Sequence, residues 1–146
     1  MKLSTRARYG VRALLELTLN QGNGPMLMSE IAENQAISRK YLHAILSRLK
    51  AAGFVRSVRG SGGGYVLAKN PEDVYLKDVL EVLEGSLSLV DCVDSPGICK
   101  QIGKCATHDL WEDMSQALEK ELNGRTLQEL AQRQRDLQDS PQMYYI

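Results

Sequence analysis

Three cysteines and one histidine fall close together in the second half of the chain. They are spaced as Cys92-x6-Cys99-x5-Cys105-x2-His108. Thiolates and a neutral imidazole are soft ligands, and four of them complete a set that suits zinc, copper(I) or an iron–sulfur cluster. An odd number of cysteines argues against a disulfide framework. The segment is therefore interpreted as a metal-binding or redox-active site.

The spacing of these residues favours a cluster. Zinc sites usually contain a close pair of cysteines such as Cys-x2-Cys, and this segment has none. Wide spacing suits ligands that must surround a larger object. A zinc site and free redox-active thiols stay open as alternatives. His108 is a candidate ligand only because it follows Cys105 so closely, since a lone histidine at the start of a helix is more often an ordinary surface residue.

The charge of the chain is divided between its two halves. Residues 1–70 contain eleven basic and three acidic residues, a net charge of +8, and the remainder carries −8. A basic half of this size suits a polyanion such as DNA. No apolar run approaches the roughly 18 residues of a membrane span, and the N-terminus lacks the apolar core of a secretory signal. We therefore expect a cytoplasmic protein without a membrane partner.

The basic half predicts three helices. Ser4 can cap the first, and the glycines and proline of residues 20–25 break it. A short helix at residues 29–34 and a turn follow, and Ser38 then caps a third helix that ends before Gly53. Two short helices joined by a tight turn are typical of a helix-turn-helix, here at residues 28–51.

The third predicted helix has the two faces that a recognition helix needs. One face must be buried while the other presents hydrogen-bond donors to base edges in the major groove. The apolar stripe consists of Tyr41, Leu42, Ile45, Leu46 and Leu49. The polar face contains Arg39, Lys40, His43, Ser47 and Lys50.

A glycine-rich hairpin is predicted next, at residues 54–68. Two β-prone runs flank Gly60-Ser-Gly-Gly-Gly64, and Arg59 beside the tip suits the DNA backbone or the minor groove. A phosphate-binding loop for a nucleotide is excluded, because no Gly-Lys-Ser/Thr follows and a strand takes the place of the required helix. The candidate DNA contacts are Arg8, Ser38, Arg39, Lys40, Tyr41, His43, Arg56, Ser57, Arg59 and Gly60.

The acidic half predicts a loop and a dimerisation helix. A helix at residues 76–83 ends at Gly85, and the cysteines lie in the loop that follows. Thr107 and Asp109 open a long amphipathic helix, and its stripe of apolar residues needs a partner surface. A two-fold dimer would supply that surface and would place two recognition helices on successive half-sites. A capping box at residues 126–129 starts a last short helix. The proposed dimer contacts are Leu110, Met114, Ala117, Leu118 and Leu122.

The predicted fold is mainly α-helical with a small β-hairpin wing. Nothing in the chain offers a substrate pocket with paired acid and base groups, so we expect neither an enzyme nor a small-molecule substrate. The expected parts are a winged helix-turn-helix domain (1–85), a cluster-binding loop (86–108), a dimerisation helix with a short following helix (109–138) and a flexible tail (139–146).

Several of these segments closely resemble the Rrf2 family, in particular its iron–sulfur cluster regulators. The similarity covers nearly all of the chain to about Leu130 and is carried by residues 1–10, 38–42, 57–65 and the cysteine loop. The resemblance implies a homodimer that binds a palindromic operator in double-stranded DNA. It also implies a 2Fe–2S cluster held by Cys92, Cys99, Cys105 and His108, whose occupancy changes promoter choice, typically as a repressor of cluster-assembly or related iron and redox genes.

Two features depart from the patterns of the family. The cluster regulators often carry a glutamate on the recognition helix at the position of His43. A carboxylate accepts a hydrogen bond from cytosine, whereas a neutral imidazole donates or accepts, so operator preference is expected to differ. Nitric-oxide-sensing relatives use an aspartate near the N-terminus as a fourth ligand, where this chain has Arg6 and Arg8. That difference favours His108, while nitric-oxide or redox sensing and a constitutive regulator with structural zinc remain alternatives.

Overall fold

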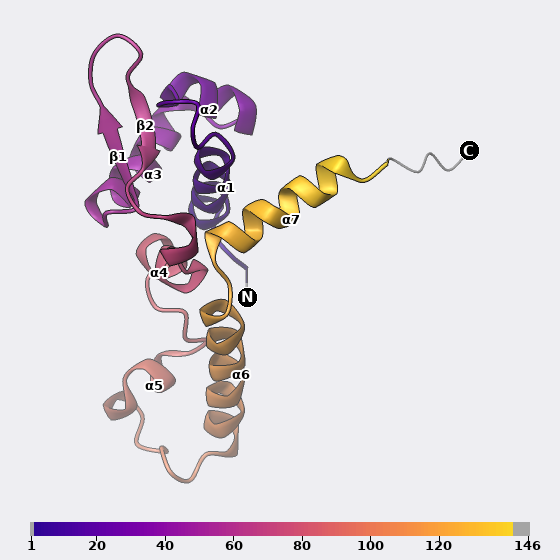
Figure 1. The fold of residues 1–146 in the computed structure, drawn as a ribbon. Coiled ribbons are helices and arrows are strands. Elements are labelled where there is room, and N and C mark those ends of the chain that lie inside the picture. Colours follow the sequence, from indigo (N-terminus) through magenta and orange to yellow (C-terminus); the bar gives the residue numbers. More distant parts are fainter. Residues whose placement is uncertain (1, 142–146) are drawn as a thin grey trace.

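The computed structural model describes residues 2–141, and within them the chain is mostly helical with one small hairpin (Figure 1). This confirms the predicted fold class. The elements are α1 (Thr5–Leu19), α2 (Met28–Gln35), α3 (Arg39–Ala51), β1 (Val55–Val58), β2 (Gly64–Leu67), the 3-10 helix η1 (Pro71–Asp73), α4 (Leu76–Glu84), α5 (Asp91–Asp94), the 3-10 helix η2 (Pro96–Ile98), α6 (Ala106–Asn123) and α7 (Leu127–Asp139).

The core lies where α1, α3 and α4 meet. Leu14, Ile45 and Leu83 are fully buried there. Gly10 of α1 allows the close approach, because a Cβ at this position would overlap the side chain of Leu83. The start of α1 is fastened to the end of α4, since the backbone N–H of Ser4 donates to Glu84 Oε1 over 2.5 Å. The predicted cap of α1 is confirmed, because Ser4 Oγ accepts from the N–H of Ala7.

The helix-turn-helix consists of α2 and α3. Between them Ala36 takes a left-handed conformation (φ 53°), and the Ser38 hydroxyl caps α3 by accepting from the N–H of Tyr41. Leu42, Ile45, Leu46 and Leu49 are fully buried, as predicted. Tyr41 is a correction: it is 36% exposed rather than part of the buried stripe. Its ring packs edge-on against Tyr9 of α1, with 6.1 Å between the ring centroids.

The predicted wing is confirmed as the antiparallel pair β1 and β2, in which Arg56 faces Val66 and Ser57 faces Tyr65. The sequence did not reveal a third strand-like segment. Met26 and Tyr65 exchange backbone hydrogen bonds of 3.0 and 2.8 Å, so the chain before α2 pairs with β2. The wing is thereby attached to the helix-turn-helix on both sides.

Gly64 makes this pairing possible, and Gly64→Ala is expected to destabilise the protein. A Cβ there would collide with the backbone of Met26, and the residue has a φ of 150°. Losing the two hydrogen bonds and adding backbone strain should reduce the free energy of unfolding by about 2–4 kcal/mol. Gly62→Ala is the control, because Gly62 also has a positive φ but meets nothing within 4 Å. Denaturant unfolding should show a clearly smaller loss for the control, and equal losses would contradict the collision.

The cysteine segment is less irregular than predicted. It contains α5 and η2, which residues 85–90 connect to α4 and residues 99–105 connect to α6. Helix α6 begins at Ala106 with Cys105 as its N-cap, so Thr107, which was predicted to open the helix, lies inside its first turn. The reason is local: the Thr107 hydroxyl lies 3.1 Å from Cys105 Sγ and does not cap a helix of its own.

Helix α7, the helix predicted to follow the dimerisation helix, packs against the winged domain. Leu127 and Ala131 are fully buried, and the N–H of Leu127 donates to the carbonyl of Val74 over 2.9 Å. The capping box at Thr126 and Glu129 is confirmed. The helix continues to Asp139, the first residue of the predicted tail, and residues 142–146 of that tail lie outside the described part.

Candidate DNA interface and cysteine site

The predicted DNA contacts gather on α3, the wing and the outer side of α1. Most are exposed: Arg8, Ser38, Arg39, Lys40, Tyr41, His43, Arg56, Arg59 and Gly60. Ser57 is half-buried, and its hydroxyl accepts a hydrogen bond of 2.8 Å from Lys50 Nζ. This bond joins the end of α3 to the wing, so Ser57 contributes to the relative position of the two elements.

Arg12 has a supporting role that sequence reasoning missed. Its guanidinium lies 5.4 Å from the centre of the Tyr9 ring. It also donates to Gln35 at the end of α2, to the side-chain oxygen over 2.7 Å and to the backbone carbonyl over 3.0 Å. Arg12 therefore holds α2, the first helix of the helix-turn-helix, against α1. Periodicity gives no signal for such a contact, because it joins residues 23 positions apart.

The cysteine site is built by the short helix α5 and the first turn of α6. Cys92 lies in α5 and His108 in α6, and Cys92 Sγ is 3.4 Å from His108 Nδ1. All three cysteines are half-buried. The hydrogen bond with the Thr107 hydroxyl, followed by one with the backbone of His108, lowers the pKa of the Cys105 thiol below its ordinary value.

The structure brings together only one pair of the four predicted ligands. Cys99 and Cys105 do not join Cys92 and His108, and within residues 2–141 no three His, Cys, Asp or Glu side chains converge closely enough to hold a metal ion. The pair that does meet has a suitable separation. Sulfur and nitrogen ligands at 2.3 and 2.0–2.1 Å from one tetrahedral metal lie about 3.5 Å apart. Donor chemistry and this distance therefore fit a soft-metal site that begins at Cys92 and His108.

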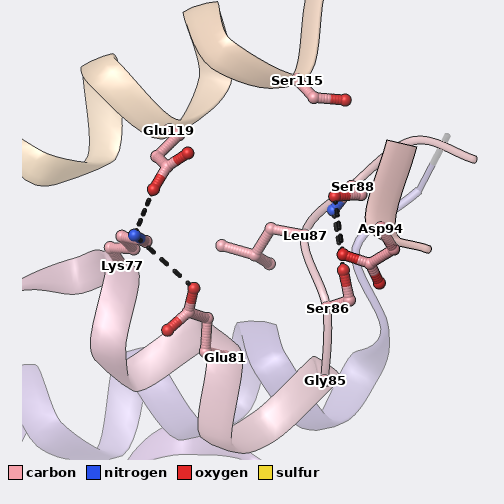
Figure 2. A pocket seen from close by; sticks show the side chains of 9 residues that line it. All are labelled: Lys77, Glu81, Gly85, Ser86, Leu87, Ser88, Asp94, Ser115 and Glu119. Carbon is pink, nitrogen blue, oxygen red and sulfur yellow. Dashed lines mark hydrogen bonds and ion pairs between the residues drawn. The ribbon is translucent and has the colours of Figure 1, made fainter. Parts of the chain in front are cut away.

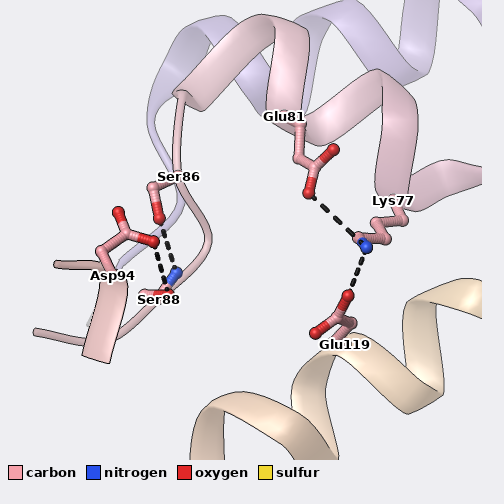
Figure 3. A network of polar contacts seen from close by, with 6 residues as sticks. All are labelled: Lys77, Glu81, Ser86, Ser88, Asp94 and Glu119. Atoms are coloured by element: carbon pink, nitrogen blue, oxygen red, sulfur yellow. Dashed lines mark hydrogen bonds and ion pairs between the residues drawn. The ribbon is translucent and has the colours of Figure 1, made fainter. Parts of the chain in front are cut away.

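Polar contacts that the sequence did not predict hold the cysteine segment in place. The N–H of Leu89 donates to Ser115 Oγ of α6 over 3.2 Å. The Ser88 hydroxyl donates to Asp94 Oδ1 over 3.0 Å, and the N–H of Ser88 donates to Ser86 Oγ over 3.1 Å (Figure 3). Hydrogen bonds within the segment therefore hold its residues together, and one further hydrogen bond attaches the segment to α6.

A second contact joins α6 to the winged domain. Lys77 of α4 binds Glu119 of α6 and lies 3.8 Å from Glu81, and the bond to Glu119 raises the Lys77 pKa above its ordinary value (Figure 2). Leu87 projects between this ion pair and the Ser88 segment, in a hollow of about 370 Å³. Helix α6 is therefore in contact with both the DNA-binding half and the cysteine segment.

The predicted dimer stripe divides between two faces of α6. Leu118 and Leu122 are half-buried, and Leu122 packs against the chain's own core. Leu110 and Met114 are 50% and 44% exposed, and Ala117 is exposed as well. Met114 also borders an apolar groove of about 470 Å³, whose walls include Leu87 and Trp111. The apolar face that lacks a partner within the described chain is therefore the part around Leu110 and Met114.

This combination of a winged helix-turn-helix and a cysteine site agrees with the comparisons. The Rrf2 family, described as an iron-dependent transcriptional regulator, matches residues 3–133. The chain belongs to the Rrf2 family. This confirms the resemblance derived from the sequence.

Curated relatives of this Rrf2 protein are HTH-type transcriptional regulators named IscR. The protein of Klebsiella pneumoniae (strain 342) is 40% identical over 134 residues, which cover 92% of this chain and 82% of the relative. That of Cronobacter sakazakii (strain ATCC BAA-894) is 39% identical over 144 residues, covering 99% and 88%. These relatives are transcriptional regulators, which supports a DNA-binding regulator rather than an enzyme.

Solved Rrf2 structures share the fold. IscR of T. potens superposes with a TM-score of 0.80 at 35% identity, covering 99% of this chain and 97% of the other. CymR, the global cysteine regulator of B. subtilis, gives 0.80 at 34% identity and covers 91% and 98%. No helix within residues 2–141 has both the length and the apolar character needed to cross a bilayer.

Proposed function

We propose that this Rrf2-family, IscR-like regulator binds a palindromic operator as a homodimer and senses a 2Fe–2S cluster. The ligands are Cys92, Cys99, Cys105 and His108. The observation that carries the proposal is the 3.4 Å approach of Cys92 Sγ to His108 Nδ1, which joins α5 to the first turn of α6. The proposal places the protein in the cytoplasm, acting as a repressor of cluster-assembly or related iron and redox genes.

The four residues have distinct tasks in this proposal. The cysteines bind as thiolates, and His108 binds through a neutral ring nitrogen, so binding competes with protons. An imidazole among thiolates raises the reduction potential relative to an all-cysteine site. The cluster supplies a group whose presence reports iron and sulfide availability. Cys99 and Cys105 must approach Cys92 and His108 when it binds, so binding requires the segment between α5 and α6 to change conformation.

This change supplies a two-state switch. The cysteine segment lies between the winged domain and α6, and Leu89 and Cys92 in its first part contact α6. The ion pair between Lys77 and Glu119 connects α6 to the winged domain. A rearrangement around a cluster thus alters how the winged domain sits relative to the dimer axis. Because half-site spacing is a geometric constraint, such a shift changes affinity for some operators and not for others.

A structural zinc site in a constitutive regulator is the second candidate, because the separation of Cys92 Sγ and His108 Nδ1 suits zinc equally well. Anaerobic purification followed by absorption spectroscopy and iron, sulfide and zinc analysis tests the proposal. We expect a reddish-brown protein with charge-transfer absorption and equal iron and sulfide. A colourless protein that contains zinc would contradict cluster sensing.

Two substitutions on the DNA face are expected to act differently. Arg59→Ala removes a contact to the backbone or minor groove and should weaken binding to every operator by a similar factor. His43→Ala removes a base contact worth about 1–3 kcal/mol and should change the preference among operators. Affinities measured on a panel of operators with single base changes separate the two effects. A uniform loss for both variants would contradict the base-reading role of His43.

A further inference from the structure

The chain between α4 and α5 runs along α6 in the opposite direction. Leu89 contacts Ser115, and three residues later Cys92 contacts His108. Ser115 and His108 are seven residues apart on one face of α6, which is a rise of about 10.5 Å. Three residues span at most about 10–11 Å when fully extended, and here only Val90 is extended (φ −145°, ψ 150°) before α5 begins at Asp91. The segment between the two contacts therefore has little slack.

The hydroxyl of Ser115 is fully engaged at this point. It donates to the carbonyl of Trp111 over 2.8 Å and accepts from the N–H of Leu89 over 3.2 Å. Ser115 is half-buried, as His108 and Trp111 are, so this face of α6 is the one covered by the cysteine segment. Nearby polar groups pair with one another, Ser88 with Asp94 and Lys77 with Glu119, rather than pointing free into the hollow (Figures 2 and 3). These paired groups are better explained as contacts that set the distance between the cysteine segment and α6 than as the lining of a pocket for a small ligand.

We infer that Ser115 is a positioning residue for the metal site. By fixing Leu89 two helical turns from His108, it sets the register at which Cys92 meets the imidazole. A slip of one residue in the segment that leads into α5 moves Cys92 by up to about 3.3 Å, which is enough to lose a ligand contact. This inference rests on the proposed function, because the site it orders is the one proposed to hold the cluster.

Three variants of the full-length chain test the inference. Ser115→Ala removes the hydroxyl, Ser115→Thr keeps it, and Gln116→Ala shortens a neighbouring exposed side chain of α6 as a matched control. Hydrogen–deuterium exchange of residues 86–95 is measured without metal. Binding of Co²⁺ to the reduced protein is followed by the thiolate-to-cobalt absorption.

For Ser115→Ala we expect exchange of residues 86–95 to rise and Co²⁺ affinity to fall, each by about 3- to 10-fold, as the loss of one hydrogen bond implies. Exchange within α6 should stay unchanged, and Ser115→Thr and Gln116→Ala should behave as the wild type. Unchanged exchange, or faster exchange with unchanged Co²⁺ affinity, would overturn the positioning role alone. If the wild type itself bound no Co²⁺, the proposed metal site would be contradicted instead, while the exchange data would still report on the contact between Leu89 and Ser115.

Discussion

Cys92→Ala is expected to remove the cluster. Cys92 is the cysteine that already contacts His108, so its loss leaves no preformed pair of ligands. Replacing even a residue that supports a ligand typically costs 10–100-fold in metal affinity, and a lost thiolate should cost more. After anaerobic purification we expect at least about 10-fold less iron and sulfide than in the wild type, and no charge-transfer absorption.

Ser95→Ala is the matched control for this prediction. Ser95 is exposed and follows α5 directly, so the substitution changes the same segment without removing a proposed ligand. The control should keep its iron and its colour. With DNA, the Cys92 variant should match cluster-free wild type at every operator and should differ from cluster-loaded wild type at some of them. A Cys92 variant that retained iron and sulfide at the wild-type level would contradict the ligand assignment.

Met114→Glu is expected to produce a monomer. Met114 is 44% exposed at the centre of the apolar face of α6 that lacks a partner within the described chain. In a two-fold dimer the new carboxylates of both subunits would lie near one another and lose contact with water, which is costly without a counter-charge. A monomer engages one half-site at a time, so affinity for the full operator should fall by about 10²–10⁴-fold.

Gln116→Glu adds the same charge to a different, exposed face of α6 and should leave the dimer intact. The molar mass from light scattering and the affinity for the full operator are measured for both variants. A Met114 variant with the mass of a dimer would place the subunit contact elsewhere. A Gln116 variant that dissociated equally would show that charge on α6, rather than the position of Met114, controls assembly.

The parts of the fold that depend on local sequence were predicted well. Ser4, Ser38 and Thr126 cap their helices as expected, because each satisfies free N–H groups within three residues of itself. The hairpin was found because a glycine-rich tip separates two β-prone runs. Apolar spacing likewise identified the buried face of α3, apart from Tyr41.

Contacts between distant segments were not predicted. Met26 pairs with Tyr65 through backbone groups, which every residue carries, so no side-chain pattern reveals them. Leu127 and Ala131 pack on the winged domain, although their spacing would serve an interface between subunits equally well. Periodicity therefore showed that a helix has an apolar face but not which surface covers it.

The same distinction between local sequence and distant contacts applies to the candidate cysteine site. Residue type and spacing selected Cys92, Cys99, Cys105 and His108, because ligand chemistry depends on the side chain itself. They did not show that Cys92 lies beside His108, or that the N–H of Leu89 donates to Ser115. Those facts depend on how the segment lies along α6, which follows from hydrogen bonds between residues 16 and 26 positions apart.

The most direct test of the account compares one protein preparation with itself. Anaerobically purified wild type is incubated with a library of duplex fragments before and after its cluster is removed, and the retained sequences and their affinities are measured. The account predicts that both forms bind DNA but that at least one class of sequences changes affinity by 10-fold or more, about 1.4 kcal/mol. Identical sequences and affinities in the two forms would contradict it.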